Sequence, residues 1–489
     1  MDNPSGKHKE MIEKAEAFVA EAAEKAARDP HRLKYHFMAP AGWMNDPNGF
    51  SFYKGEYHLF YQHYPFSAAS TFSFKYWGHA KSKDLVRWER LPIALAPSED
   101  YELGGCWSGS AVDDDGKLTL IYTGHVDGRS PKEVQAIAVS ADGVMFDKYE
   151  RNPVVARPPA EASDDFRDPK VWKRGDDWYM LVGTGKDGVG KVVLYRSKDL
   201  REWTYVGVAA ESDGTQGEMW ECPDLFELDG KDVLIVSPIG MKSHKNIAIV
   251  GKMDYASGKF VQESYQELDL GPDFYAAQTV ADDRDRRILI AWMDMWGNPM
   301  PTVERGWAGA MTIPRLLRLS PDGRVRAVPL PELEQLRGPG RSFGPLAVEP
   351  DGSGAPDDLQ GDALEIVAEF DLSVSDCRRC GLKLRRSGDG REETVVAYDA
   401  GTGELVVDTT KSGIGLKAVS GGRVAIGEDG VLKLHIFLDS SSVEAFAGEG
   451  ETAISARIYP SPGSLGACVF AEGGTAYLRR LDAWELARA

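Results

Sequence analysis

The sequence is short of cysteine and has no long apolar run. Its five cysteines are scattered over 489 residues, so they form no disulfide framework of the kind that holds small secreted domains together. Cys377 and Cys380 form a single CxxC pair with no histidine or second pair nearby, which indicates a structural role rather than a metal or redox site. No stretch approaches 18 consecutive apolar residues, so no membrane-spanning helix is expected.

Basic residues are also in the minority. The 57 lysines and arginines are outnumbered by 76 aspartates and glutamates, which gives a formal net charge of −19 and a pI near 5.0. Coulomb repulsion therefore opposes non-specific binding to nucleic acid or to an anionic membrane, whereas a small neutral ligand is not affected. Residues 1–30 carry charges throughout and lack the apolar run of a secretory signal, so a cytoplasmic location is predicted.

The first 30 residues show the period of an amphipathic helix instead. Apolar side chains recur at helical spacing with Glu and Lys between them, at Met11, Ile12, Ala15, Phe18, Val19, Ala22 and Ala26. We therefore expect a short N-terminal helix over residues 1–30 that packs on the body of the protein.

A long-period repeat runs through the first 300 residues. Five apolar runs that end in a turn signal are expected to be equivalent strands: Tyr57–Gln62, Leu118–Thr123, Trp178–Gly183, Val233–Ser237 and Ile288–Met293. Their centres are 61, 60, 54 and 55 residues apart. The segment SKDLVRW at 82–88 recurs 115 residues later as SKDLREW at 197–203. A unit of this length made of short strands predicts a five-bladed β-propeller over residues 31–330.

Three acidic residues occupy nearly the same place in this repeat. Asp46 and Glu221 each lie 15 residues before the centre of their strand, and Asp168 lies 14 residues before its own. Trp107 and Ala276 hold the equivalent places in the other two units. If the first strand of each blade is innermost, the three carboxylates converge on one axial pocket. Burial of several carboxylates together is unfavourable, so such a cluster usually serves a ligand, a metal or a reaction. The alternative is that they cap turns on the propeller surface.

A change of composition near residue 330 marks a second domain. Residues 331–361 are rich in Pro and Gly and are expected to form a linker. Residues 362–489 contain short alternating segments with Gly-rich turns, which predicts an antiparallel β-sandwich and makes the protein all-β. This domain shows no acid cluster, and we interpret Asp439 and Glu444 as turn and rim groups.

The neighbours of the three acids carry a family resemblance. The motifs are WMNDPNG at 43–49, WSGS at 107–110, FRDP at 166–169, WECP at 220–223 and the segment 439–446. Through them the chain resembles glycoside hydrolase family 32, the β-fructofuranosidases, over nearly its whole length. The resemblance implies a glycosidase that retains anomeric configuration, with two carboxyl groups about 5–5.5 Å apart. It implies Asp46 as the nucleophile, Glu221 as the acid/base and Asp168 as the acceptor of hydrogen bonds from fructosyl hydroxyls.

The same resemblance implies further sugar contacts. The residues that match the family's pocket are Asn45, Gln62, Phe72, Trp107, Ser108, Arg167, Tyr275 and Trp292. For Tyr275 and Trp292 the alternative is packing inside the blade. Phe72 stands where family members often carry a Trp, so a phenyl ring is expected to stack there in place of an indole. Cys222 should place its side chain close to the acid/base.

Three functions stay open at this point. The chain is a hydrolase that releases terminal β-fructose from sucrose, sucrose 6-phosphate or short fructo-oligosaccharides, or a fructosyltransferase on the same intermediate, or a non-catalytic sugar-binding protein. A protonatable acid at Glu221 argues against the last. No metal or organic cofactor is implied, because acid/base chemistry on an acetal requires none. A phosphate on the substrate would call for Lys75, Lys186 or Lys242 at the pocket rim. The β-sandwich is expected to pack on the propeller, to form a homodimer contact or to bind sugar weakly.

Overall fold

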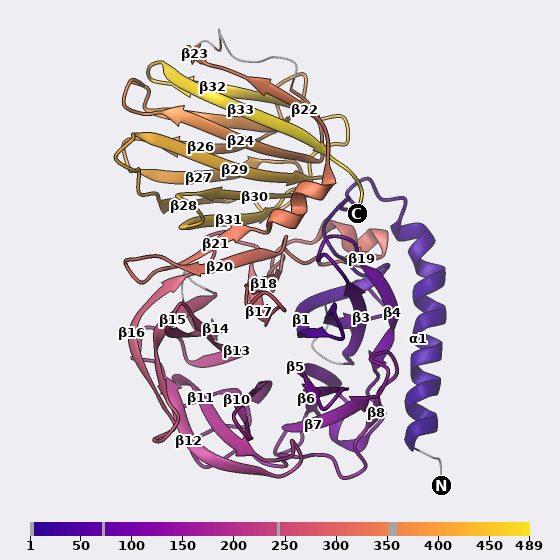
Figure 1. Ribbon diagram of the computed structural model, residues 1–489. Helices are drawn as coiled ribbons and strands as arrows, with labels where there is room; N and C mark the ends of the chain where they lie inside the picture. The colour runs from indigo at the N-terminus through magenta and orange to yellow at the C-terminus, as the bar shows by residue number, and fades with distance from the viewer. Residues whose placement is uncertain (1–3, 71–73, 242–244, 351, 353–358) are drawn as a thin grey trace.

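The computed structural model describes residues 4–70, 74–241, 245–350, 352 and 359–489. The chain forms a ring of β-sheets and then a two-sheet sandwich, and helix α1 (Pro4–Ala26) runs along the outside of the ring beside β4 (Figure 1). The predicted architecture, an all-β propeller followed by a β-sandwich with a short N-terminal helix, is confirmed. None of the described helices combines the length and the apolar character that crossing a membrane requires.

Five antiparallel sheets form the ring. In chain order their strands are β1 (Gly42–Tyr53), β2 (Glu56–Tyr64), β3 (Tyr76–Ser82), β4 (Glu89–Leu95); β5 (Gly105–Asp114), β6 (Lys117–His125), β7 (Glu133–Ser140), β8 (Asp147–Lys148); β9 (Phe166–Arg174), β10 (Asp177–Lys186), β11 (Val189–Ser197), β12 (Trp203–Glu211); β13 (Met219–Leu228), β14 (Lys231–Ile239), β15 (Ile247–Asp254), β16 (Lys259–Glu267); and β17 (Tyr275–Ala281), β18 (Arg287–Trp292), β20 (Arg315–Leu319), β21 (Val325–Pro329). The second strands, β2, β6, β10, β14 and β18, coincide with the five apolar runs of the sequence. They are buried because each lies between two neighbouring strands and between adjacent sheets.

Three of the five hairpins between first and second strands have the same kind of turn. In the sheets of β1, β5 and β13 the two turn residues are Lys54–Gly55, Asp115–Gly116 and Asp229–Gly230, with φ between 49° and 85°. Two positive φ values in succession are typical of a type I′ turn, whose twist matches that of the flanking strands. Glycine stands second because a side chain is strained in this conformation.

A short strand closes the ring. β19 (Trp307–Ala308) follows the 3₁₀ turn η2 (Pro301–Arg305) and pairs in parallel with β1, Gly42 opposite Trp307 and Trp43 opposite Ala308. The first strands of the five sheets, β1, β5, β9, β13 and β17, contact one another in that order around the centre. Equivalent places on these strands therefore face one axial region, as the repeat of acidic residues required.

The sandwich contains two antiparallel sheets. One has the order β22 (Arg337–Phe343), β33 (Ala476–Leu486), β24 (Leu364–Asp371), β29 (Val431–Asp439), β30 (Ser442–Ala447), β31 (Thr452–Arg457), with β23 (Leu346–Val348) also on β33; the other has the order β28 (Val419–Arg423), β27 (Glu404–Lys411), β26 (Glu393–Asp399), β25 (Arg379–Arg386), β32 (Gly466–Glu472). Cys377 and Cys380 are buried in the core between these sheets.

The expectation that residues 331–361 form a linker is wrong for their first half. The 3₁₀ turn η3 (Pro331–Leu336) leads directly into β22, which pairs with β33. β22 lies at the edge of its sheet, where the missing N–H of Pro339 is tolerated. Glycine and proline therefore mark an edge strand here rather than a flexible connection.

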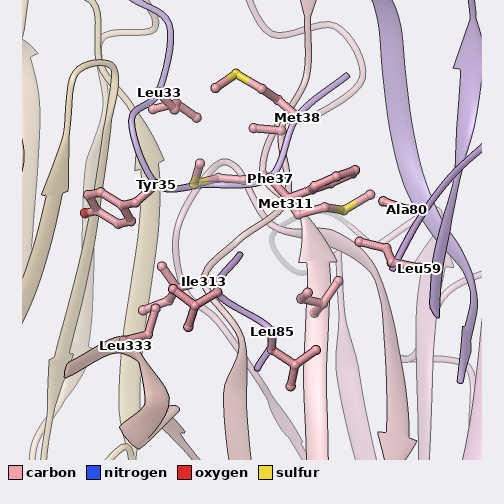
Figure 2. Close-up of a cluster of buried hydrophobic side chains, with 14 of the residues drawn as sticks. Leu33, Tyr35, Phe37, Met38, Leu59, Ala80, Leu85, Met311, Ile313 and Leu333 are labelled. Atoms are coloured by element: carbon pink, nitrogen blue, oxygen red, sulfur yellow. The ribbon is translucent and has the colours of Figure 1, made fainter. Parts of the chain in front are cut away.

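The segment that follows α1 joins the ring to the sandwich. Figure 2 shows side chains of this segment packed with the first sheet, with the connection between β3 and β4, and with residues near the end of the ring. They are Leu33, Tyr35, Phe37 and Met38 of the segment, Leu59 and Ala80 of the sheet, Leu85 of the connection, and Met311, Ile313 and Leu333. The backbone N–H of Met311 also donates to the carbonyl of Phe37 at 2.9 Å. Burial of side chains of this size contributes roughly 1.5–3 kcal/mol each, so this cluster holds both domains to the N-terminal segment.

Buried charges lie in the same interface. His36 Nδ1 is 2.8 Å from Asp439 Oδ2 and its Nε2 is 2.9 Å from Glu444 Oε1, and all three side chains are 0 % exposed. Glu444 also accepts a hydrogen bond from Arg315 at 2.6 Å. Burial lowers the pKa of His36, but the bonds to Asp439 and Glu444 outweigh it and raise that pKa. Asp439 does lie beside the turn between β29 and β30, where its Oδ1 accepts a hydrogen bond from the N–H of Ser440 at 2.7 Å. The interpretation of Asp439 and Glu444 as rim groups is wrong, because both carboxylates are buried in this interface.

Candidate active site

A break in the strand ladder recurs in all five innermost strands at the places that the repeat marks. Regular pairing is interrupted over residues 44–47 of β1, 107–109 of β5, 167–170 of β9, 221–224 of β13 and 275–278 of β17. A β-bulge of this kind bends the strand and re-aims its side chains. Asp168, Cys222 and Ala276 accordingly have positive φ values of 63°, 49° and 55°. The bulges place one set of side chains from every blade at the axis.

These side chains line a cavity of about 380 Å³. The predicted site residues found in its wall are Asn45, Asp46, Gln62, Trp107, Ser108, Arg167, Asp168, Glu221 and Tyr275. Its volume falls in the range of small-ligand sites. The three carboxylates predicted to converge do so, which excludes the alternative that they cap surface turns.

Asp46 is oriented by its own strand and by the next blade. Ser108 Oγ donates to Asp46 Oδ2 at 2.7 Å, and Asn45 Nδ2 donates to Asp46 Oδ1 at 3.0 Å. The indole N–H of Trp43 donates to Asn45 Oδ1 at 2.7 Å, which keeps the amide nitrogen directed at Asp46. Burial raises the pKa of Asp46, while the bonds from Ser108 and Asn45 act in the opposite direction. The carboxylate is thus held in one orientation and kept closer to its ionised form.

Glu221 is held from two sides. Arg167 Nε donates to Glu221 Oε1 at 2.8 Å, and the hydroxyl of Tyr275 donates a short hydrogen bond to Glu221 Oε2. Arg167 is itself bound by Glu133 at 3.2 Å and by Asp165 at 2.8 Å. Sequence analysis missed Glu133, which is 0 % exposed. The only local signal was a charged residue at the start of the apolar segment that forms β7.

Asp168 is tied to the strand that carries Glu221. Its Oδ2 accepts a hydrogen bond from the backbone N–H of Cys222 at 2.9 Å. Burial, and then the negative charge of Glu221, raise the pKa of Asp168. The Cys222 thiol lies 3.5 Å from Asp168 Oδ2 and 3.8 Å from Asp46 Oδ2, so the sulfur links two of the three acids. Burial raises the pKa of that thiol, which keeps it protonated.

Two predicted contacts have a different outcome. Trp292 is fully buried and is not among the described residues that line the cavity, because it packs between Trp43 and Trp296 at ring distances of 5.9 and 5.0 Å. The prediction for Trp292 is therefore wrong, and Trp296, four residues further on, lines the cavity instead. Phe72 lies outside the described residues.

The rest of the wall was not predicted as a sugar contact. An apolar part contains Pro238, Ile239, Met241, Met295 and Trp296. Two lysines, Lys75 and Lys245, also line the cavity. Of the phosphate candidates, Lys186 is partly buried outside the cavity wall and donates to the carbonyl of Ala160, and Lys242 lies outside the described residues.

Two family models match the chain along nearly its whole length. The "Glycosyl hydrolases family 32 N-terminal domain" matches residues 36–329, and the "Glycosyl hydrolases family 32 C terminal" matches residues 332–485. The chain belongs to glycoside hydrolase family 32. It is therefore a glycoside hydrolase, and the cavity lies in the part matched by the family's N-terminal model.

Relatives and solved structures agree with this membership. The chain is 40% identical to a sucrose-6-phosphate hydrolase of Zymomonas mobilis over 99% of this chain and 98% of that protein. It is 37% identical to the family 32 β-fructofuranosidase of Bombyx mori, with a TM-score of 0.84 and coverage of 100% and 99%. The structure of sucrose-6-phosphate hydrolase from Lactobacillus gasseri gives a TM-score of 0.86 at 26% identity, with 96% of each chain covered.

Proposed function

We propose that this family 32 enzyme is a retaining β-fructofuranosidase that hydrolyses the terminal β-D-fructofuranosyl bond of sucrose, sucrose 6-phosphate or short fructo-oligosaccharides. The activity is that of its family and of the relatives described above. The observation that carries the mechanism is the meeting of Asp46, Asp168 and Glu221 in one cavity. Double displacement needs two such carboxyl groups on opposite sides of the scissile bond.

In the first step Asp46 attacks the anomeric carbon of the fructosyl unit. Glu221 gives its proton to the glycosidic oxygen as the carbon–oxygen bond breaks, and the aglycone leaves as an alcohol. The negative charge of Glu221 acts on both Asp168 and Asp46, and this mutual repulsion favours retention of a proton in the site for this step. The bonds from Arg167 and Tyr275 keep Glu221 in place.

In the second step water resolves the fructosyl ester on Asp46. Glu221, now a carboxylate, takes a proton from the water as its oxygen attacks the anomeric carbon, and the bond to Asp46 breaks. Asp168 accepts hydrogen bonds from fructosyl hydroxyls, and these bonds strengthen as positive charge develops on the ring. Fructose is released with the configuration of the substrate.

Product analysis with the purified protein tests this proposal. Hydrolysis predicts equal initial rates of glucose and fructose release from sucrose, with the β-anomer of fructofuranose formed first in the NMR spectrum. A fructose rate below the glucose rate would identify a fructosyltransferase. No release from sucrose, sucrose 6-phosphate or 1-kestose would contradict catalysis and leave a sugar-binding protein. The ratios of kcat/KM on the same three sugars identify the preferred substrate.

Removal of one hydrogen bond to Asp46 should shift the pH dependence of activity. Asp46 attacks as the ionised carboxylate, and the bond from Ser108 favours that form. We expect Ser108→Ala to raise the pKa of Asp46, so the acidic limb of kcat/KM moves to higher pH by about one unit. Ser110→Ala is the control, since Ser110 Oγ on the same strand donates to the carbonyl of Pro169 instead. If the acidic limb of the pH profile of kcat/KM is unchanged in Ser108→Ala, ionisation of Asp46 does not determine that limb.

Location and assembly remain proposals. All five cysteines are free thiols, which supports the reducing environment of the cytoplasm. The catalytic work is proposed to lie in residues 31–330, with residues 362–489 as a supporting domain. A homodimer through the β-sandwich remains a prediction.

A further inference from the structure

Lys75 places a positive charge in the cavity that the mechanism above does not use. It precedes β3, and its carbonyl accepts a hydrogen bond from the N–H of Cys106 at 2.8 Å, which fixes its backbone. The residue is 2 % exposed and lines the cavity. In the described part of the chain, Lys75 Nζ has no hydrogen-bond partner.

Among the described residues, two aromatic rings lie beside this ammonium group. Lys75 Nζ lies 5.1 Å from the ring centre of Trp43 and 5.7 Å from that of Trp296. Cation–π contacts replace only part of the hydration that a buried ammonium loses. Accordingly, burial lowers the pKa of Lys75 to about 7, although the charge of Asp46 acts against this.

Two partly buried lysines of the ring are satisfied by protein groups. Lys170 donates to Asp224 Oδ2 at 3.0 Å and to the carbonyl of Thr279 at 3.2 Å. Lys148 donates to Glu102 and, at 3.0 Å, to Ser98 Oγ. Lys75 differs from both because its ammonium group has no oxygen acceptor among the described residues. Lys75 lines the cavity, where a ligand can supply that acceptor.

We propose that Lys75 is a substrate-binding residue whose ammonium group donates hydrogen bonds to hydroxyl oxygens of the fructosyl unit. This inference rests on the proposed function, in which that unit is bound covalently to Asp46. Lys75 and Asp46 line the same cavity and each acts on the charge of the other. A sugar ring held against Asp46 therefore brings its hydroxyls to Lys75.

The charges of the site favour a hydroxyl over a phosphate as this acceptor. A phosphate at Lys75 would lie in the field of the same Asp46 carboxylate, with Asp168 and Glu221 also in the wall. Arg167 cannot offset that repulsion, because it is already bound to Glu221 and two further carboxylates. A neutral hydroxyl accepts the same hydrogen bond without adding negative charge.

The test compares Lys75→Met with the wild type on sucrose and on sucrose 6-phosphate. Methionine keeps the length and apolar stem but removes the donors. We expect kcat/KM to fall by the same factor on both substrates, roughly 10- to 100-fold. Lys186→Met is the control and should match the wild type, because Lys186 is not among the described residues that line the cavity. An unchanged kcat/KM, or a loss confined to sucrose 6-phosphate, would overturn the inference.

A second measurement separates binding from packing. Because methionine replaces an uncompensated buried charge, the Tm of Lys75→Met should equal or exceed that of the wild type. A lower Tm would assign Lys75 a structural role through Trp43 and Trp296, and would overturn the inference. Binding of D-fructose, followed by calorimetry, should weaken in the variant by a similar factor. The binding measurement does not depend on catalytic turnover. It can therefore contradict the role of Lys75 without contradicting the hydrolase function, and the reverse.

Discussion

Alanine in place of Asp46 will lower kcat for sucrose by about 10⁴-fold or more and leave the fold intact. The side chain that attacks the anomeric carbon is gone, and neither Ser108 nor Asn45 can replace it as a nucleophile. The Tm should stay level or rise, because the change removes one of three mutually repelling carboxyl groups. Initial rates of glucose release and thermal unfolding of the same preparation measure both effects.

Azide distinguishes loss of the nucleophile from general damage to the site. In Asp46→Ala the small anion can enter the vacated space, attack the anomeric carbon from that face and displace the aglycone as Glu221 protonates it. We expect partial recovery of turnover and a fructosyl azide of configuration opposite to the substrate. Asp283→Ala, on an exposed turn, is the control and should behave as wild type. More than a tenth of normal activity in Asp46→Ala would reject the assignment.

The repeat predicted the meeting of the three acids because propeller geometry converts position within a unit into position around an axis. Asp46, Asp168 and Glu221 lie far apart in sequence but at one height on the innermost strands. The bulges that turn them toward the axis left no clear sequence signal, since they depend on pairing with the second strand. The spacing alone therefore located the site. The family motif was needed to suggest which carboxylate is the nucleophile and which is the acid/base.

Other features depend on contacts between distant segments. Trp292 is the last residue of β18 and Trp296 lies four residues beyond it, and the point at which the strand ends decides that the first packs and the second lines the cavity. Glu444 sits in a strand that alternates polar and apolar residues, as a half-exposed strand does. Its partners Arg315 and His36 lie 129 and 408 residues away, so no local pattern showed that the propeller buries it.

The lack of a hydrogen-bond partner for Lys75 also depends on contacts between distant segments. A single lysine before an apolar strand is typical of a surface residue. The sequence analysis named Lys75 only as one of three candidates for binding a phosphate. Its burial follows from the closing of the ring, which brings Trp43 of the first sheet and Trp296 of the last against one ammonium group. Ring closure is a property of the whole propeller, so it is visible only in three dimensions.

Replacement of Glu221 with alanine should produce a loss that depends on the leaving group. With sucrose the departing alkoxide needs a proton, and we expect kcat/KM to fall by about 10²- to 10⁴-fold. With 4-nitrophenyl β-D-fructofuranoside the leaving group is stable as an anion, so formation of the fructosyl-enzyme should be much less affected. The burst of 4-nitrophenol reports that first step, and the steady rate reports the second, in which Glu221 acts as the base.

Azide gives the opposite stereochemical result in this variant. Asp46 still forms the covalent intermediate, and azide, which needs no general base, should then attack from the side of the missing Glu221 carboxylate. The product is a fructosyl azide with the configuration of the substrate, in contrast to the inverted product of Asp46→Ala. Glu218→Ala, an exposed acid three residues earlier, should match the wild type. Equal losses on sucrose and the aryl substrate would remove Glu221 from the role of acid, because protonation of the leaving oxygen is the one step in which the two substrates differ.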